Sequence, residues 1–252
     1  MPQTRTVSQP TGLPLRQSAR PAVQAVPSRW RQGVELSPLF STIAPAEVAE
    51  ILAAAHTTTF ARRQTIFFAG EKTQQVVLLT EGSVKITQID EFGSTVILRL
   101  AGPGEVIGEI GGGRLGSPLT AEARLSCKAL VWDSQSFESL SERFPTLQRN
   151  TMRILAKSLR DLEARFCEIA TKRVAQRLAL ELARLLPQVG KQVGEDIEIN
   201  LSREELAQMT ATTLFTVSRQ LSLWEEQGIV SLRRLGVVIR DPLSLMTISE
   251  LR

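Results

Sequence analysis

The side chains best suited to acid–base, nucleophilic or metal chemistry are scarce in this sequence. It contains a single histidine, His56, and two cysteines, Cys127 and Cys167. One histidine argues against a Ser-His-Asp hydrolase and against a metal site built from several imidazoles. No acid–base pair, nucleophile with a histidine, or metal-ligand spacing is present. The sequence therefore predicts that the chain is not an enzyme and has no dedicated metal site.

A second group of residues, near the C-terminus, has a helix–break–helix pattern. A capping box at Ser202 opens a predicted helix over Arg203–Met209, Thr210–Thr212 form a short break, and a second helix covers Thr213–Gln227. Ala207 is small and lets the axes of the two helices approach each other. This pattern is the outline of a helix-turn-helix.

The second helix has a polar outer face that fits the major groove of DNA. Val217 and Leu221 turn inward, which leaves the N-terminal half of the helix outside. Arg219 offers a planar fork of donors for O6 and N7 of guanine, and a threonine or leucine side chain can pack on a thymine methyl group. The residues expected to contact bases or phosphates are Arg203, Thr213, Leu214, Phe215, Thr216, Ser218, Arg219, Arg233 and Arg234.

A basic hairpin and a last helix follow. Strands are expected at Ile229–Leu232 and Val237–Arg240 with a turn at residues 233–234, and an Asp-Pro pair at 241–242 opens the helix. A basic hairpin after two helices completes a winged helix-turn-helix. The alternative is a helical hairpin with a solvated arginine.

An apolar stripe precedes this region and follows Pro145. Its members recur three and four residues apart over about 2.5 heptads. They are Met152, Leu155, Leu159, Leu162, Phe166 and Ile169. This spacing is the a/d pattern of a two-stranded coiled coil, and we predict a dimerisation helix over residues 145–170. The alternative is a single amphipathic helix that lies on its own domain.

The N-terminal half has short strands separated by glycine turns. Strands are expected at Val76–Thr80, Val84–Ile89 and Thr95–Leu100, and the clearest strand, Ala121–Val131, places its odd-numbered residues on one apolar face. A short helix over Pro45–Ala55 precedes them. Strands at this spacing without intervening helices indicate a β-sandwich or jelly roll, so the chain as a whole is predicted to be α+β.

Length and composition are those of a globular chain with one large domain or two small ones. The 252 residues are 42% hydrophobic, with a mean hydropathy of −0.01. No apolar run exceeds five residues, which excludes a membrane span. Two cysteines cannot build a disulfide framework, which fits a reducing cytosol and predicts a cytoplasmic protein.

The charge balance is uneven. Residues 1–34 carry five arginines and no acidic residue, so the net charge of +4 for the whole chain leaves −1 for residues 35–252. The first segment has no hydrophobic period, and we predict a disordered basic arm, either solvated or with a nucleic-acid or partner role. The predicted domains are the arm (1–34), the β-rich domain (35–144), the dimerisation helix (145–170) and the winged helix-turn-helix (171–252).

In their order along the chain, these features resemble the CRP/FNR family of bacterial transcription regulators. The resemblance covers residues 35–250 and rests on the strand region with Gly104–Glu109, the long helix, and the motifs Thr216–Arg219 and Trp224–Val230. It implies a symmetric homodimer with a cyclic-nucleotide-binding-like effector domain and a C-terminal reader of inverted-repeat, double-stranded DNA. Control by a small effector and contact with RNA polymerase are also implied.

The resemblance also implies an effector pocket, which would include Gly108, Glu109, Leu119 and Thr120. In the cyclic-AMP receptors of the family, Glu109 would take the ribose hydroxyl and an Arg-Ser pair would bind the cyclic phosphate. In this sequence, Leu119 and Thr120 occupy the positions of that Arg-Ser pair. A leucine side chain offers the phosphate neither a positive charge nor a hydrogen-bond donor. We expect weak cyclic-AMP binding unless Arg114 or Arg124 substitutes.

Two other branches of the family differ in their ligands. The iron–sulfur oxygen sensors need four cysteines, and residues 1–35 contain none. The segment Thr212–Arg219 is most similar to the nitric-oxide and denitrification regulators. Haem is the sharpest ligand hypothesis for that branch, with His56 as a weak candidate ligand and Cys127 or Cys167 as a thiolate. The alternative is a surface or capping role for the histidine and a core role for Cys127.

The recognition helix departs from that of the oxygen sensors, since Phe215 stands where those proteins have a glutamate. The cytosine contact of the glutamate then cannot form, while Ser218 and Arg219 keep their roles by resemblance. We expect a half-site with one guanine bound by Arg219 and thymine-rich neighbours touched by Leu214 or Phe215. Two other interpretations stay open: a ligand-sensing module that acts on a protein partner, and a DNA-binding regulator that needs no effector.

Overall fold

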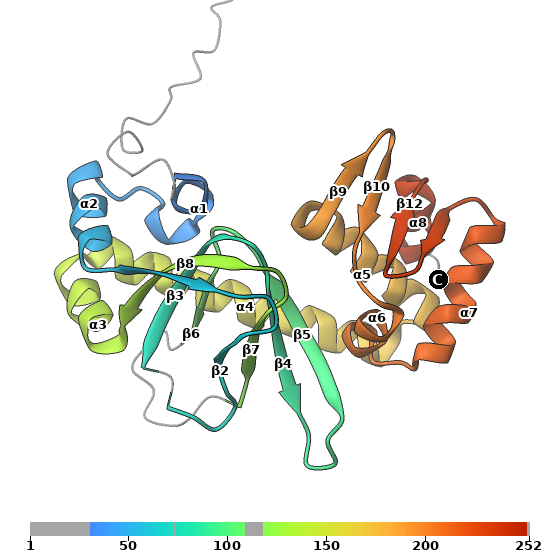
Figure 1. Ribbon diagram of the computed structural model, residues 1–252, viewed down its shortest axis with the longest axis horizontal. Coiled ribbons are helices and arrows are strands. Elements are labelled where there is room, and N and C mark those ends of the chain that lie inside the picture. Colours follow the sequence, from blue (N-terminus) through green and yellow to red (C-terminus); the bar gives the residue numbers. More distant parts are fainter. Residues whose placement is uncertain (1–30, 73, 109–117, 251–252) are drawn as a thin grey trace, which may run out of the picture.

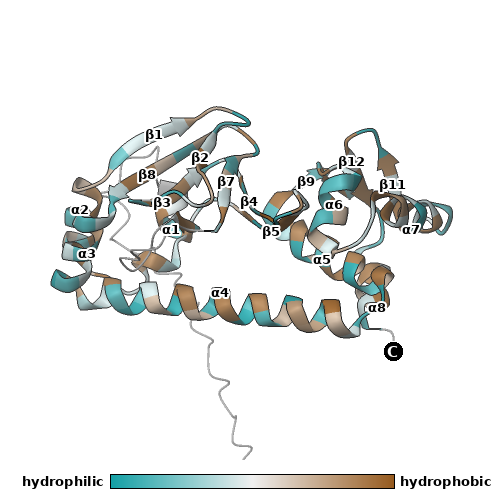
Figure 2. Cartoon of the chain, turned by 90° about the horizontal axis from the view of Figure 1, so that it is seen from below, coloured by the Kyte–Doolittle hydropathy of each residue, from teal (hydrophilic) through white to brown (hydrophobic). Residues whose placement is uncertain are grey.

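The computed structural model describes residues 31–72, 74–108 and 118–250. A β-rich N-terminal domain and a smaller, helix-rich C-terminal domain lie side by side, and the long helix α4 (Pro145–Thr171) runs along both (Figures 1 and 2). The α+β class expected from the sequence is confirmed.

Two four-stranded antiparallel sheets form the core of the N-terminal domain, and we call them together the β-roll. One sheet has the strand order β1-β8-β3-β6 and the other β2-β7-β4-β5. The strands are β1 (His56–Phe60), β2 (Thr65–Phe67), β3 (Gln75–Glu81), β4 (Val84–Ile89), β5 (Thr95–Ala101), β6 (Val106–Gly108), β7 (Thr120–Ala123) and β8 (Cys127–Asp133). The inner faces enclose an apolar cluster that includes Phe60, Val77 and Ile86.

The expected strand Ala121–Val131 is in fact two strands, one in each sheet. β7 pairs with β4 and β8 pairs with β3, so the chain must turn between them to change sheets. Leu125 lies in this turn and is 48% exposed rather than on the apolar face. The backbones cross closely here: a Cβ at Gly82 (φ +86°) would lie 2.3 Å from the carbonyl oxygen of Ser126, so only glycine fits.

A helical layer covers the outer face of the β1-β8-β3-β6 sheet. It consists of α1 (Arg31–Leu36), the 3-10 helix η3 (Pro38–Phe40), α2 (Pro45–Ala53) and α3 (Ser134–Arg143). Val34 is buried in this layer, so residues 31–34 belong to the domain and not to the predicted arm, whose first 30 residues lie outside the described part. His56 begins β1 and does not end the helix before it, which stops at Ala53.

Helix α4 is anchored to the β-roll over its first turns. Pro145 occupies the first turn, where no backbone N–H is needed, and Leu147 is fully buried. The Nδ2 group of Asn150 donates to the carbonyl oxygens of Leu39 (2.9 Å) and Ser41 (2.7 Å). Although α4 has 27 residues, no helix in the described parts of the chain is both long and apolar enough to cross a membrane.

Replacing Asn150 with alanine tests this anchor. Two carbonyl oxygens would lose their donor, at a cost of about 1–3 kcal/mol for each unsatisfied buried group. We expect the free energy of unfolding to fall by about 2–4 kcal/mol in urea titrations followed by tryptophan fluorescence. Gln148→Ala, at an exposed position of the same helix, is the control. Equal transition midpoints for the two variants would show that the anchor contributes nothing.

The C-terminal domain packs helices on a four-stranded antiparallel sheet of order β11-β12-β10-β9. Its elements are α5 (Val174–Val189), β9 (Gly190–Val193), β10 (Asp196–Ile199), α6 (Arg203–Thr210), α7 (Leu214–Glu226), β11 (Val230–Arg233), β12 (Gly236–Ile239) and α8 (Pro242–Glu250). β9 is a strand that the sequence analysis does not predict. All its side chains are exposed, so no alternation marked it, and its pairing with β10 makes it a strand.

The two domains share a packed contact. Ile97 and Leu100 of β5 are buried in the same apolar cluster as Leu178 of α5 and Leu206 of α6. The β4–β5 hairpin therefore joins the β-roll directly to the C-terminal domain.

Candidate nucleic-acid interface

Helices α6 and α7 form the helix-turn-helix, and local hydrogen bonds fix its ends. Ser202 Oγ accepts from the N–H of Glu205 (3.1 Å), and the Glu205 carboxylate accepts from the N–H of Ser202 (2.8 Å), which is the expected capping box. Ala211 ends α6 in the left-handed conformation, with φ of 50°. Thr213 Oγ1 then accepts from the N–H of Thr216 (3.2 Å) and opens α7.

Arg177 of α5 holds this turn from outside the motif. Its guanidinium donates to the carbonyl oxygens of Thr210 (3.0 Å) and Ala211 (3.2 Å) and to that of Lys172 (2.9 Å), at the junction between α4 and α5. These bonds offset the cost of about 1 kcal/mol for a left-handed alanine. The sequence analysis missed Arg177. Its spacing of four and seven residues from Glu181 and Arg184, on a largely apolar helix, was the available signal.

The N-terminal half of α7 has the expected division into a buried and an exposed side. Val217 and Leu221 are fully buried, which confirms their inward orientation. Leu214 is 51% and Phe215 76% exposed, and Arg219 is exposed. Thr213 is exposed as well, while Thr216 and Ser218 are half-buried. The exposed side is available to a nucleic acid.

Basic side chains flank α7 on both of its neighbours. Arg233 and Arg234 are exposed at the turn between β11 and β12, and Arg203 is half-buried in the first turn of α6. The hairpin is tied to the last turn of α7, since the N–H of Leu232 donates to Glu225 Oε1 (2.7 Å). The predicted DNA-contacting residues thus all come from α6, α7, its N-cap and the hairpin.

The effector pocket expected by resemblance lies partly outside the described residues, because Glu109 and Arg114 do. Gly108 ends β6 with φ of +98°, and a Cβ there would lie 2.2 Å from the carbonyl oxygen of Gln75. The close approach of β6 to β3 therefore requires glycine at this position, whatever the pocket binds.

The other two pocket candidates bring no charge to the interior of the β-roll. Leu119 is half-buried and packs on the inner apolar cluster, and Thr120 Oγ1 accepts from the N–H of Ala69 (3.1 Å). Ala123 faces the interior of the β-roll, and Arg124, the next residue, is half-buried just after the end of β7. Burial lowers the pKa of Arg124, and the charge of Glu205 on α6 opposes that shift.

The three haem-ligand candidates lie on three different elements, β1, β8 and α4. His56 is exposed at the start of β1 and pairs with Val131, whereas Cys127 pairs with Phe60, four residues further along the strand, or about 13 Å. Cys167 is exposed on α4. In residues 31–72, 74–108 and 118–250, no three His, Cys, Asp or Glu side chains are grouped to hold a metal ion.

The two cysteines differ in accessibility. Cys127 is buried, and its burial raises the pKa of its thiol; Cys167 is exposed. Because the thiolate is the reactive form, we expect a maleimide to modify one thiol per native chain near neutral pH and both after unfolding in urea. Native Cys167→Ser should then react with none. Rapid modification of that variant would contradict the burial of Cys127.

The apolar stripe of α4 lies on the outside of the chain. Its exposed fractions are Met152 61%, Leu155 38%, Leu159 57%, Leu162 53%, Phe166 71% and Ile169 48%. Figure 2 shows hydrophobic residues recurring along the helix. The alternative in which this stripe packs on its own domain is therefore wrong. We call these six residues the seam.

Comparison with known proteins agrees with both domains. A model of the cyclic nucleotide-binding domain matches residues 57–144, and one of the Crp-like helix-turn-helix domain matches residues 172–248. The Cyclic AMP receptor protein of Thermus thermophilus is 29% identical over 209 residues, or 81% of this chain and 93% of the relative. The CRP-like cAMP-activated global transcriptional regulator of Mycobacterium tuberculosis is 25% identical over 209 residues, or 81% and 92%.

A solved structure shows the same arrangement of domains. FixK2 from Bradyrhizobium japonicum superposes with a TM-score of 0.70 at 23% identity, covering 79% of this chain and 98% of that protein. Two family models on either side of a long helix, relatives matched over most of their length and a shared fold agree with one another. The chain belongs to the CRP/FNR family of DNA-binding transcription regulators.

Proposed function

We propose that the chain works as a homodimer that reads an inverted repeat in double-stranded DNA, under the control of a small effector in the β-roll. The seam is the observation that carries this proposal: six exposed apolar side chains in a/d spacing on a helix that leads directly into a DNA-binding domain. A second copy buries this strip through the same pattern of knobs and holes.

A dimer built along α4 places its two α7 helices about a twofold axis. Such a protein matches half-sites arranged as an inverted repeat, with major-groove faces about 34 Å apart. In each half-site, Arg219 donates two hydrogen bonds to O6 and N7 of a guanine, and Leu214 or Phe215 packs on thymine methyl groups. Thr213, Thr216 and Ser218 add contacts near the N-terminus of the helix.

The flanking arginines bind phosphates. Arg203, Arg233 and Arg234 lie on the elements next to α7 and carry fixed positive charge. Each phosphate contact releases a condensed counterion, so the DNA affinity should fall steeply as salt rises. We expect the dimer to bind the bacterial chromosome next to RNA polymerase. Because the chromosome lies in the cytoplasm, the dimer would act there.

The effector belongs to a class that needs no arginine at position 119 to bind a phosphate. Leu119, at the position of the phosphate-binding arginine of the cyclic-AMP receptors, packs on the apolar interior of the β-roll. Although the relatives described above are named for cyclic AMP, we infer that this chain does not respond to it as they do. Isothermal titration with cyclic AMP at about 1 mM should give no saturable heat, which corresponds to a binding free energy weaker than about −4 kcal/mol. A saturable heat would overturn this part of the proposal.

Selection from a pool of random duplexes with the purified full-length chain tests the function. We expect enrichment of inverted repeats whose half-sites share a guanine and have centres about 10–11 base pairs apart. The affinity of the selected duplex should fall with salt. If no duplex were enriched and DNA binding did not depend on salt, the result would favour a ligand-sensing module that acts on a protein partner. Enrichment that no small molecule changes would favour a regulator without an effector.

A further inference from the structure

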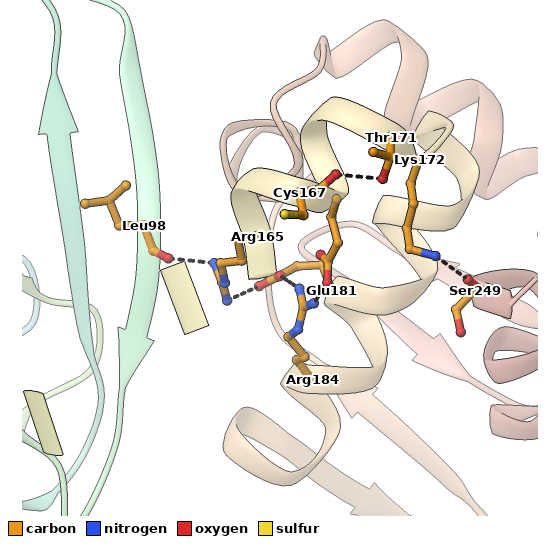
Figure 3. Close-up of polar contacts among 9 residues, drawn as sticks. Leu98, Arg165, Cys167, Thr171, Lys172, Glu181, Arg184 and Ser249 are labelled. Atoms are coloured by element: carbon orange, nitrogen blue, oxygen red, sulfur yellow. Dashed lines mark hydrogen bonds and ion pairs between the residues drawn. The ribbon is translucent and has the colours of Figure 1, made fainter. Parts of the chain in front are cut away.

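A network of partly buried charges joins α4 to α5. Arg165 of α4 contacts Glu181 of α5 (Nη2 to Oε1, 3.2 Å), and Arg184 contacts the other carboxylate oxygen of Glu181 (3.2 Å) and Glu168 of α4 (Figure 3). Two arginines and two glutamates, with no net charge, thus bridge the dimerisation helix and the first helix of the DNA-binding domain.

These four side chains are partly shielded from water, Glu181 almost completely. The exposed fraction of the side chain is 3% for Glu181, 16% for Glu168, 20% for Arg165 and 30% for Arg184. Burial alone would lower the pKa of Arg184, but its hydrogen bonds and proximity to the two glutamates raise it, so the guanidinium stays charged. Ion pairs in such a site are screened much less than surface pairs, and they hold one geometry.

Arg165 also connects this network to the β-roll. Its Nη1 group donates to the carbonyl oxygen of Leu98 on β5 (2.6 Å), between the residues that pack on the C-terminal domain (Figure 3). On the same face of α5 as Glu181 and Arg184, Arg177 holds the turn that precedes α7. One guanidinium therefore links the effector domain, the dimerisation helix and the helix that positions the recognition helix.

The covalent connection between α4 and α5 consists of residues 172–173, both in extended conformation. Such a short non-helical link does not fix an angle by itself, so side-chain contacts must do so. In a twofold dimer, a change in this angle alters the separation of the two α7 helices from both sides.

We propose that Arg165 is a positioning residue that fixes the angle between α4 and α7, and thereby the half-site spacing that the dimer accepts. This inference rests on the proposed function. Arg165→Met tests it, since the variant removes the links to Leu98 and Glu181 while Arg184 still neutralises Glu181.

The measurement is the affinity for the selected inverted repeat, for the same repeat with one base pair inserted or removed, and for a single half-site. We expect the native chain to prefer the best spacing by about tenfold or more, and Arg165→Met to lose about tenfold affinity for that spacing only. Its preference should shrink to about threefold, with single half-site binding within twofold of the native value. Arg165→Lys, which keeps the charge but lacks the fork, should recover part of the preference.

Arg160→Met, at an exposed position of the same helix, is the matched control and should behave as the native chain. An unchanged spacing preference in Arg165→Met, or an equal loss on the single half-site, would overturn the inference and leave the proposed function intact. If the native chain bound no inverted repeat, the proposed function would fail instead.

A second readout, without DNA, decides the inference in either case. Spin labels at Glu142→Cys and Glu226→Cys of one chain, in a Cys167→Ser background diluted with unlabelled protein, report the angle through their distance distribution. A distribution that is broader in Arg165→Met than in Arg160→Met is expected, and identical distributions would reject the proposal.

Discussion

Leu159→Glu is expected to convert the dimer into a monomer and to remove specific DNA binding at the same time. Leu159 lies at the middle of the seam and is 57% exposed in the single chain. In the proposed dimer, two introduced carboxylates would meet across the twofold axis in an apolar contact. An unpaired buried charge costs several kcal/mol, so the dissociation constant of the dimer should rise by at least about a thousandfold.

Analytical ultracentrifugation and DNA titration of the same sample measure both effects. Ala164→Glu is the matched control, because it introduces the same residue on the exposed, opposite face of α4. The control should remain dimeric and bind the inverted repeat normally. Monomeric Leu159→Glu that still bound the repeat with native affinity would contradict the coupling of dimerisation to recognition.

Arg219→Ala should remove the guanine preference of each half-site. A bidentate arginine–guanine pair discriminates by about 1–3 kcal/mol, so the affinity should fall about tenfold per half-site and about a hundredfold for the full repeat. The effect should disappear on a repeat whose guanine has been replaced, because the variant no longer distinguishes the bases. Titration of both duplexes with both proteins completes a double-mutant cycle.

Arg233→Ala is the comparison for the Arg219 experiment, since Arg233 is expected to bind a phosphate. It should weaken binding to both duplexes equally and reduce the slope of log affinity against log salt by about one for each phosphate that the variant no longer neutralises. If Arg219→Ala behaved in this way, and not by losing base discrimination, α7 would not read the guanine.

Elements with strong local signals could be predicted from the sequence alone. Helix α4 begins at Pro145 and keeps its 3-4 apolar spacing to Ile169, and both features are local. The capping box at Ser202 and the break before Thr213 likewise located the helix-turn-helix, because caps depend on residues only three positions apart.

Features that depend on distant parts of the chain could not be predicted. The turn at Leu125 exists because β7 and β8 pair with strands of different sheets, while the residues on either side of it keep one alternation. Strand β9 has no apolar face, and only its pairing with β10 defines it.

The charge network between α4 and α5 could not be predicted from the sequence for the same reason. Arg165 and Glu168 are charged residues beside the apolar stripe of the predicted dimerisation helix, yet both contact residues of α5, and Glu181 is buried. Charged residues beside an apolar helical stripe are usually exposed to solvent. Only the packing of α5 on α4 shows that Arg165 and Glu168 connect the two helices.

The measurement that tests the central claim most directly is native mass spectrometry of the full-length chain with the selected inverted-repeat duplex. The account predicts two chains on one duplex, two chains without DNA, and no such complex for Leu159→Glu. A single chain bound to the full repeat with native affinity, or a native chain that is monomeric without DNA, would contradict a dimer built along the seam.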